Sequence, residues 1–407
     1  MNIKTITYTI IIVGLFIGSQ LNTFAQGTGG ASYNQLLGQD DINAITTAVP
    51  FLLIAPDSRA GALGDIGVSL SPDANSQHWN AAKYPFIEKK MGFSVSYSPW
   101  LRNLVNDINL SYITGYYKLN DMSAISGSLR YFSLGTIEFT DKFGNHQGDY
   151  QPNEFAIDAA YSRKLGENIS GSVTLRYINS NLTQGQNVNG QSTQVGQAIA
   201  ADIGVYYAKD VKFGKTKGKF AFGTSISNIG NKISYSESLE RDFLPMNFRI
   251  GPSLTVDLDK YNQLTFAIDI NKLLVPTPPI YATDSLNNPI PDGNSWKIEK
   301  GMDPNRSVGN AMFSSWYDAP GGFKEEMREF YIGTGIEYVY DKKFFVRGGY
   351  FYEHATKGNR KYFTLGAGFK YNVFALDFSY LIPTTQRNPM ENTLRFTLIF
   401  NFSETKG

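Results

Sequence analysis

Apolar side chains alternate with polar or small ones over most of this 407-residue chain. Between Met91 and Phe402 the alternation forms about fourteen segments of about ten residues, the length of a tilted strand that crosses a bilayer. A period of two predicts β-strands with one apolar and one polar face. The predicted strands span residues 91–99, 107–119, 122–134, 154–166, 168–180, 196–210, 218–229, 244–258, 262–273, 328–340, 343–353, 360–371, 373–382 and 392–402.

The connections between these segments alternate in length. Every second connection is a tight polar turn, such as Asn120-Asp121, Asp341-Lys342 or Asn372, and the others are longer. Tight periplasmic turns and long extracellular loops are typical of bacterial outer-membrane barrels. In a soluble β-sandwich, by contrast, nothing requires short and long connections to alternate along the chain. We therefore predict an all-β fold: a transmembrane antiparallel barrel of about fourteen strands over residues 91–402, integral to the outer membrane and surrounded by membrane lipids.

Charged side chains recur on the polar faces of the predicted strands, opposite the apolar ones. At a lipid-facing site near the bilayer midplane, an Arg or Lys would cost about 2–4 kcal/mol. We therefore expect these charges to point into the lumen and, because their signs balance, to form ion pairs across neighbouring strands. A packed lumen is favoured over a selective ion path. The predicted lumen charges are Arg130, Asp158, Arg176, Asp202, Arg249, Asp269, Glu337, Arg347, Asp377 and Arg395.

Aromatic residues gather at the ends of the predicted strands, as in the girdles that anchor barrels at the two membrane interfaces. They are given no catalytic role. The predicted periplasmic girdle contains Tyr116, Tyr117, Tyr206, Tyr207, Tyr338 and Tyr340, and the extracellular one Tyr131, Phe132, Tyr177, Tyr350, Tyr352 and Tyr380.

Pro252 lies inside the predicted strand 244–258, on its apolar face. Proline cannot donate a ladder hydrogen bond, so the favoured interpretation is a bulge or strand end. The alternative is a locally weakened pairing that helps to form a lateral opening in the wall.

The N-terminal part of the chain differs from the barrel. Lys4, an apolar run over 6–17 and Thr23-Phe24-Ala25 are typical of an export signal peptide over residues 1–25. Residues 26–90 lack the strand pattern and are predicted to form a periplasmic or plug segment. Residues 403–407 are a short tail after the last strand.

The sequence offers little catalytic chemistry. It has no cysteine and three histidines, none of which lies in a predicted strand. The formal net charge is +1, so composition gives no indication of a nucleic-acid partner. Gly61, Gly64 and Gly67 lack the context of a nucleotide-binding loop and are better explained by close backbone packing. We expect no enzyme activity, no cofactor and no metal site.

The stretches Phe51–Asp65 and Ser71–Lys83 carry a resemblance to a known family. Asn80-Ala81-Ala82-Lys83, just before the first strand, is similar to the Asn-Pro-Ala-type motif of FadL-like outer-membrane transporters, although Ala81 replaces the usual proline. The two longer stretches more specifically resemble the PorV (LptO) family of the type IX secretion system, found in Bacteroidota. By this resemblance, the family-motif residues of the plug are Arg59, Asp65, Asp73, Asn75, His78, Trp79 and Asn80.

The resemblance implies a FadL-like barrel that serves protein secretion without enzymatic activity. Such proteins receive the C-terminal domains of secreted cargo from a SprA/Sov-type translocon barrel and deliver the cargo to a PorU-type attachment complex. The alternative is a FadL-like channel for hydrophobic small molecules. No cargo-binding residue can be transferred by motif.

The longest connection, residues 274–327, is the candidate partner-binding loop. It starts with a proline-rich stretch and contains many aromatic side chains, which outside the membrane require a partner surface or the barrel's own mouth. Its extended backbone could also offer a strand edge to a β-domain. A lid packed over the lumen is the equally weighted alternative. The candidate contact residues are Ile280, Tyr281, Trp296, Phe313, Trp316 and Tyr317.

Overall fold

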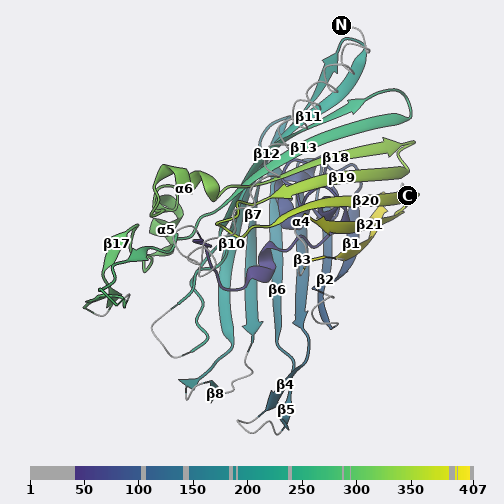
Figure 1. The fold of residues 1–407 in the computed structure, drawn as a ribbon. Helices are drawn as coiled ribbons and strands as arrows, with labels where there is room; N and C mark the ends of the chain where they lie inside the picture. The colour runs from purple at the N-terminus through teal and green to yellow at the C-terminus, as the bar shows by residue number, and fades with distance from the viewer. Residues whose placement is uncertain are drawn as a thin grey trace.

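Fourteen antiparallel strands form a closed barrel in the computed structural model (Figure 1), which confirms the predicted fold. Successive wall strands pair with each other, and β1 closes the barrel on β22 with Met91 opposite Phe402. The wall strands are β1 (Met91–Pro99), β2 (Ile108–Lys118), β3 (Ser123–Leu134), β6 (Asn153–Lys164), β7 (Ile169–Asn181), β10 (Gly196–Phe213), β11 (Thr216–Gly230), β12 (Asn247–Asp257), β13 (Asn262–Leu273), β18 (Tyr331–Tyr340), β19 (Phe344–Tyr352), β20 (Lys361–Tyr371), β21 (Phe374–Pro383) and β22 (Leu394–Phe402).

The structure describes residues 42–101, 107–140, 146–182, 187–188, 191–236, 241–286, 288–293, 295–384, 390–391 and 393–403. The predicted signal peptide, residues 26–41 of the predicted plug segment and residues 404–407 lie outside these ranges. Within them, no helix is long and apolar enough to span a bilayer.

Side-chain burial follows the period of two along the wall. In β1, for example, Phe93 and Val95 are exposed on the outer face, whereas Ser94 and Ser96 are buried inside. The tight turns also have the expected chemistry. In the connection between β18 and β19, the two adjacent residues Asp341 and Lys342 both adopt positive φ, as at the centre of a type I′ turn.

The longer connections carry small elements of their own. Among the described residues, four two-stranded sheets, β4–β5, β8–β9, β14–β17 and β15–β16, extend the loops at the extracellular end. The longest loop also contains two short helices (Figure 1). These elements are β4 (Ile137–Thr140), β5 (His146–Tyr150), β8 (Asn187–Val188), β9 (Gln191–Ser192), β14 (Ile280–Tyr281), β15 (Pro291–Asp292), β16 (Ser295–Trp296), β17 (Ile298–Lys300), α5 (Val308–Ser314) and α6 (Phe323–Arg328).

Residues 42–90 enter the lumen and form a plug of short turns. Its elements are η2 (Pro50–Leu53), α3 (Ser58–Gly61), α4 (Ser76–Trp79) and η3 (Ala81–Phe86). Two apolar clusters show how the plug packs: Phe51 and Leu52 lie against Phe132 near the extracellular end, and Tyr84 stacks on Tyr116 near the periplasmic end. The core of the molecule is therefore the interface between the plug and the inner face of the wall.

Some local predictions about the wall are wrong. Three residues predicted for the aromatic girdles are instead buried inside the barrel: Tyr116, Tyr206 and Phe132. Each occupies an inward position of its strand, so its side chain faces the plug. The predicted strand 328–340 begins only at Tyr331, since residues 323–328 form α6.

Pro252 does not end its strand, so the favoured prediction of a strand end or bulge is wrong. It is exposed on the outer face and pairs in register with Phe222 of β11. On the other side, the ladder to β13 lacks pairs at Gly251 and Pro252 but resumes in the same register at Ser253. The missing proline donor therefore interrupts the pairing locally.

Candidate functional site

The middle of the plug lies against a wall of glycines. Gly64 has φ +78° and its backbone approaches Gly333 and Gly349 so closely that a Cβ atom at either position would collide with it. A Cβ atom at Gly335 would lie 2.6 Å from the carbonyl oxygen of Leu63. The glycines therefore let the plug backbone pack directly on β18 and β19.

Arg59 links the plug to the wall by charge. Its guanidinium donates to both carboxylate oxygens of Glu337, at 3.1 and 3.0 Å, and to Asp73 at 2.8 Å. Glu337 also accepts from Arg347, whose guanidinium reaches Asp377 at 2.5 Å. All three wall residues are buried, so the plug cation completes a charge network inside the barrel.

Two further wall charges bind the plug next to its glycine turn. Arg395 lies 3.2 Å from the carboxylate of Asp65, which also accepts from the hydroxyl of Tyr362. Asp269 accepts from the backbone N–H groups of Gly67 and Val68, at 2.7 and 3.0 Å. A fully buried carboxylate with two backbone donors fixes the chain direction at this point.

His78 lies next to Arg130. The guanidinium of Arg130 donates to the carbonyl oxygen of Leu52 at 2.8 Å and lies 2.5 Å from His78 Nδ1. Because a guanidinium has no acceptor, Nδ1 must accept and the imidazole is neutral. Burial, and then the charge of Arg130, place the pKa of this plug histidine well below its usual value. His78 is thus a structural acceptor in the plug.

The remaining motif residues also join the plug to itself and to the wall. Trp79 donates to Asp57 at 2.7 Å, and Arg249 lies over its indole ring at 4.7 Å. Asn80 donates to the carbonyl oxygen of Val205 at 2.9 Å. Asn75 is buried, and its backbone N–H donates to Asp73.

All ten predicted lumen charges are buried in the structure. Six of them pair with one another. Arg176 pairs with Asp158 and Asp202 on its two neighbouring strands. Arg347 pairs with Glu337 on the neighbouring β18 and reaches Asp377 on β21, across β20. The other four, Arg130, Arg249, Asp269 and Arg395, contact the plug. The sequence pattern therefore identified inward charges but could not distinguish these two kinds of partner.

The long loop is anchored at its base and exposed beyond it. Leu274, Val275 and Ala311 are buried in a cluster with Met246 at the barrel mouth. Figure 1 shows β17, α5 and α6 standing out to one side of the barrel. Of the candidate residues, Tyr281 is partly buried and the others are exposed: Ile280 (43%), Trp296 (47%), Phe313 (69%), Trp316 (41%) and Tyr317 (62%).

The sequence analysis missed the group of charges that holds this loop. Lys272 contacts Glu326 at 3.0 Å and Glu329 at 2.5 Å, and Lys357 contacts Glu329 at 3.0 Å. Lys272 is fully buried although strand alternation places it on the outer side of β13. A lysine at an outward position next to the longest loop could have indicated that the loop covers this part of the wall. In the same way, the inward glycines of β18–β20 could have indicated the surface on which the plug backbone packs.

Two cavities lie at opposite ends of the lumen. One, of about 390 Å³, opens at the extracellular end between residues 44–55 and the ends of β13, β18 and β20. The other, of about 310 Å³, lies at the periplasmic end beside Arg59, Asp73 and Lys219. The glycine-packed part of the plug lies between them. Among the described residues, no three acidic or histidine side chains are grouped as metal ligands.

Solved structures with a similar fold include the toluene transporter TbuX of Ralstonia pickettii, at 10% identity, covering 86% of this chain and 100% of that chain, with a TM-score of 0.44. TodX of Pseudomonas putida, also a toluene transporter, shares 11% identity over 88% and 98% of the two chains, with a TM-score of 0.42. A FadL homologue of Pseudomonas aeruginosa shares 10% identity over 89% and 100%, with a TM-score of 0.41.

No curated protein matches the chain. The family described as "Type IX secretion system protein PorV" matches residues 37–280, more than half of the chain. The match includes the whole described plug and the first nine wall strands. It confirms the resemblance seen in the sequence and, with the barrel, the outer-membrane location. This chain belongs to the PorV family of type IX secretion system proteins.

Proposed function

We propose that this protein is a non-enzymatic subunit that binds the C-terminal domains of exported cargo proteins at the cell surface. It would receive them from a SprA/Sov-type translocon barrel and pass them to a PorU-type attachment complex. Family membership supports the secretion context. The observation that carries cargo binding is the loop 274–327, which is anchored at its base yet exposes a group of aromatic side chains.

The exposed loop has the chemistry of a protein contact. Phe313 and Tyr317 are 69% and 62% exposed, and Phe323 is 80% exposed nearby. Aromatic side chains of this kind dominate the affinity of protein interfaces. The short strand pairs β14–β17 and β15–β16 in the same loop offer backbone edges to a β-domain.

The way in which the plug is held in the lumen bears on the alternative function. The plug is held by buried ion pairs, by backbone hydrogen bonds and by direct packing on glycines, on several sides of the barrel. A channel for hydrophobic molecules, the alternative function, would require a path between the two lumen cavities. It also predicts that uptake of such molecules fails when the protein is deleted, whereas the secretion role predicts that exported proteins fail to reach the surface.

The test is a pull-down of a purified cargo C-terminal domain with the full-length protein in detergent. The double variant Phe313→Ala/Tyr317→Ala should lose at least about tenfold in affinity, since the loss of even one hot-spot aromatic costs about 2 kcal/mol or more. Tyr261→Ala, an exposed tyrosine in a periplasmic turn, is the control and should bind normally. Deletion of residues 280–317 should abolish binding. Undiminished binding by both loop variants would contradict the proposed role of this loop.

A further inference from the structure

The outer wall carries a trough in its lipid-facing surface, lined by small residues. Gly115 of β2, Gly127 of β3 and Ala159 of β6 are directly paired across adjacent strands and all face outward. In the same cross-strand row, Phe93 of β1 closes one end and Leu175 of β7 the other. We call this feature the wall trough; it spans four strand spacings, or about 19 Å.

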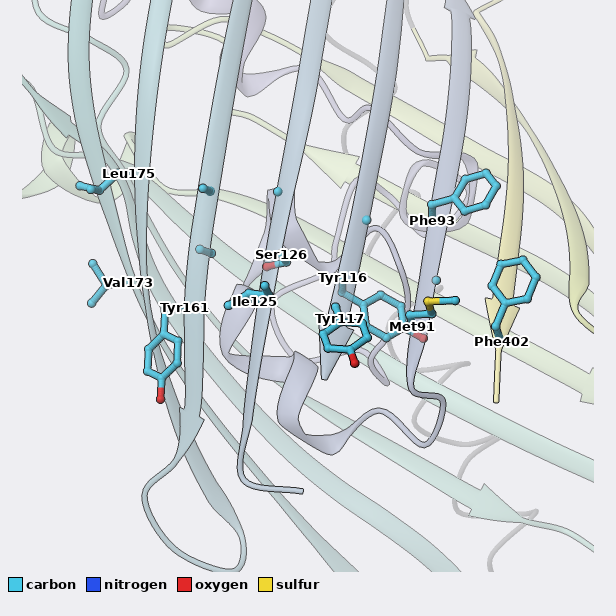
Figure 2. A pocket seen from close by; sticks show the side chains of 15 residues that line it. Met91, Phe93, Tyr116, Tyr117, Ile125, Ser126, Tyr161, Val173, Leu175 and Phe402 are labelled. Atoms are coloured by element: carbon cyan, nitrogen blue, oxygen red, sulfur yellow. The ribbon is translucent and has the colours of Figure 1, made fainter. Parts of the chain in front are cut away.

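Bulky side chains flank the wall trough along both sides. The row on its periplasmic side is Met91, Tyr117, Ile125, Tyr161 and Val173, paired strand by strand. On the extracellular side, the corresponding row is Val95, Ile113, Leu129, Ile157 and Tyr177. The hollow over the central and periplasmic rows has a volume of about 920 Å³, opens outward, and has an almost entirely apolar lining. Figure 2 shows Phe93 and Leu175 on opposite sides of this surface, with Met91, Tyr117, Ile125, Tyr161 and Val173 below them.

The wall trough lies near the periplasmic interface. Figure 2 shows the hydroxyl groups of Tyr117 and Tyr161 on the side of the short turns, as expected for tyrosines at the level of lipid headgroups. Tyr161 was absent from the girdle predicted from the sequence. Its position next to Tyr117 across β3 marks where the hydrocarbon ends and the polar region begins.

Positive charge lies next to these tyrosines. The ammonium group of Lys90 lies 5.6 Å from the ring centroid of Tyr117. Arg163 is exposed two residues beyond Tyr161 on the same outward face of β6. Over residues 88–90, 118–122 and 163–167 the chain has five Lys or Arg and three Asp or Glu, and Asp121 is paired with Lys118. The rim of the trough therefore favours an anion at headgroup level.

We propose that the wall trough is a specific binding site for an anionic phospholipid of the periplasmic leaflet. One acyl chain lies over Gly115, Gly127 and Ala159, and the phosphate lies at Lys90 and Arg163. Within a bilayer the wall is already surrounded by acyl chains, so binding one particular lipid brings no hydrophobic gain. A preference for that lipid must come from close packing and charge. Small residues allow the acyl chain to approach the strand backbone, and the two cations select the headgroup.

The experiment is native mass spectrometry of the full-length protein in detergent with added phosphatidylglycerol or phosphatidylcholine. The unmodified protein should retain phosphatidylglycerol preferentially. Ala159→Leu fills the trough and should lower its retention at least tenfold. Ala367→Leu, the same change at an exposed outward alanine of β20, is the matched control and should retain it normally.

A second pair of variants tests the headgroup. Lys90→Gln should reduce the preference for phosphatidylglycerol about fivefold, the factor for about 1 kcal/mol per basic residue at a membrane surface. Lys260→Gln is its control, because Lys260 lies in a periplasmic turn at a similar distance, 5.3 Å, from the ring of Tyr261. Far-ultraviolet circular dichroism shows whether each variant is folded.

Two outcomes would overturn the proposal. Equal retention of the two lipids would mean that the protein carries phospholipid without selecting its headgroup, that is, as an adventitious additive only. Loss of a co-purifying membrane protein from folded Ala159→Leu, with lipid retention unchanged, would assign the trough to a protein partner instead.

Discussion

At the scale of single residues, the position of the plug depends on missing side chains as much as on charges. Gly348 and Gly349 are adjacent in β19 but face opposite sides of the wall. A Cβ atom at Gly349 would collide with Gly64 of the plug, whereas at Gly348 the nearest atom would lie 3.9 Å away. Gly349→Ala should therefore destabilise the seated plug by about 1–3 kcal/mol, the usual cost of overpacking. Hydrogen exchange of the amides in residues 60–68 measures the effect.

Gly348→Ala is the control for this prediction. It adds the same methyl group to the neighbouring residue, on the lipid side, and should leave exchange in the plug unchanged. If the two variants lose protection equally, the effect belongs to the strand backbone, and the close contact between plug and wall does not limit stability.

At the scale of elements, the strands were predictable from the sequence and their partners inside the lumen were not. A strand shows its two faces within ten residues, so local alternation located all fourteen wall strands. Whether an inward charge meets another strand, as Arg176 does, or the plug, as Arg395 does, depends on a residue far away in sequence. For the same reason the outward position of Lys272 indicated a partner outside the wall but not that this partner is Glu326 of α6, 54 residues later.

The docking of α6 on the barrel rim should depend on Lys272. Its ammonium group is fully buried between the carboxylates of Glu326 and Glu329. Lys272→Met would leave buried acidic groups without this partner, and breaking a buried pair costs about 3–5 kcal/mol. We expect α6 to detach while the barrel stays folded. Limited proteolysis within residues 313–330 should become faster.

Lys343 provides a matched comparison at the other end of the barrel. It pairs with Asp341 at 2.6 Å in an exposed periplasmic turn. Exposed pairs contribute about 0–1 kcal/mol, so Lys343→Met should leave proteolysis of both regions unchanged. Resistance of α6 in Lys272→Met would show that the apolar cluster at the loop base is sufficient to hold the loop.

At the scale of the whole molecule, the plug and the wall share one interior of paired charges but differ in the free energy needed to open them. The wall is a closed ladder of fourteen strands, whereas the plug consists of helical turns of four to six residues. Short elements with few internal hydrogen bonds open at lower free energy than a closed sheet. We expect the intact protein to be non-conducting in a planar bilayer and to show channel openings in urea before the barrel unfolds.

Salt should not replace urea in this experiment. The contacts that hold the plug, such as those of Arg59 and Asp269, are buried and therefore weakly screened, so concentrated KCl alone should leave the lumen closed. Gly349→Ala should lower the urea concentration at which openings begin, because it weakens the plug and not the wall. A conducting barrel without denaturant would mean that the lumen is an open path, which favours the transport alternative. Simultaneous conductance and barrel unfolding would mean that plug and wall are a single cooperative unit.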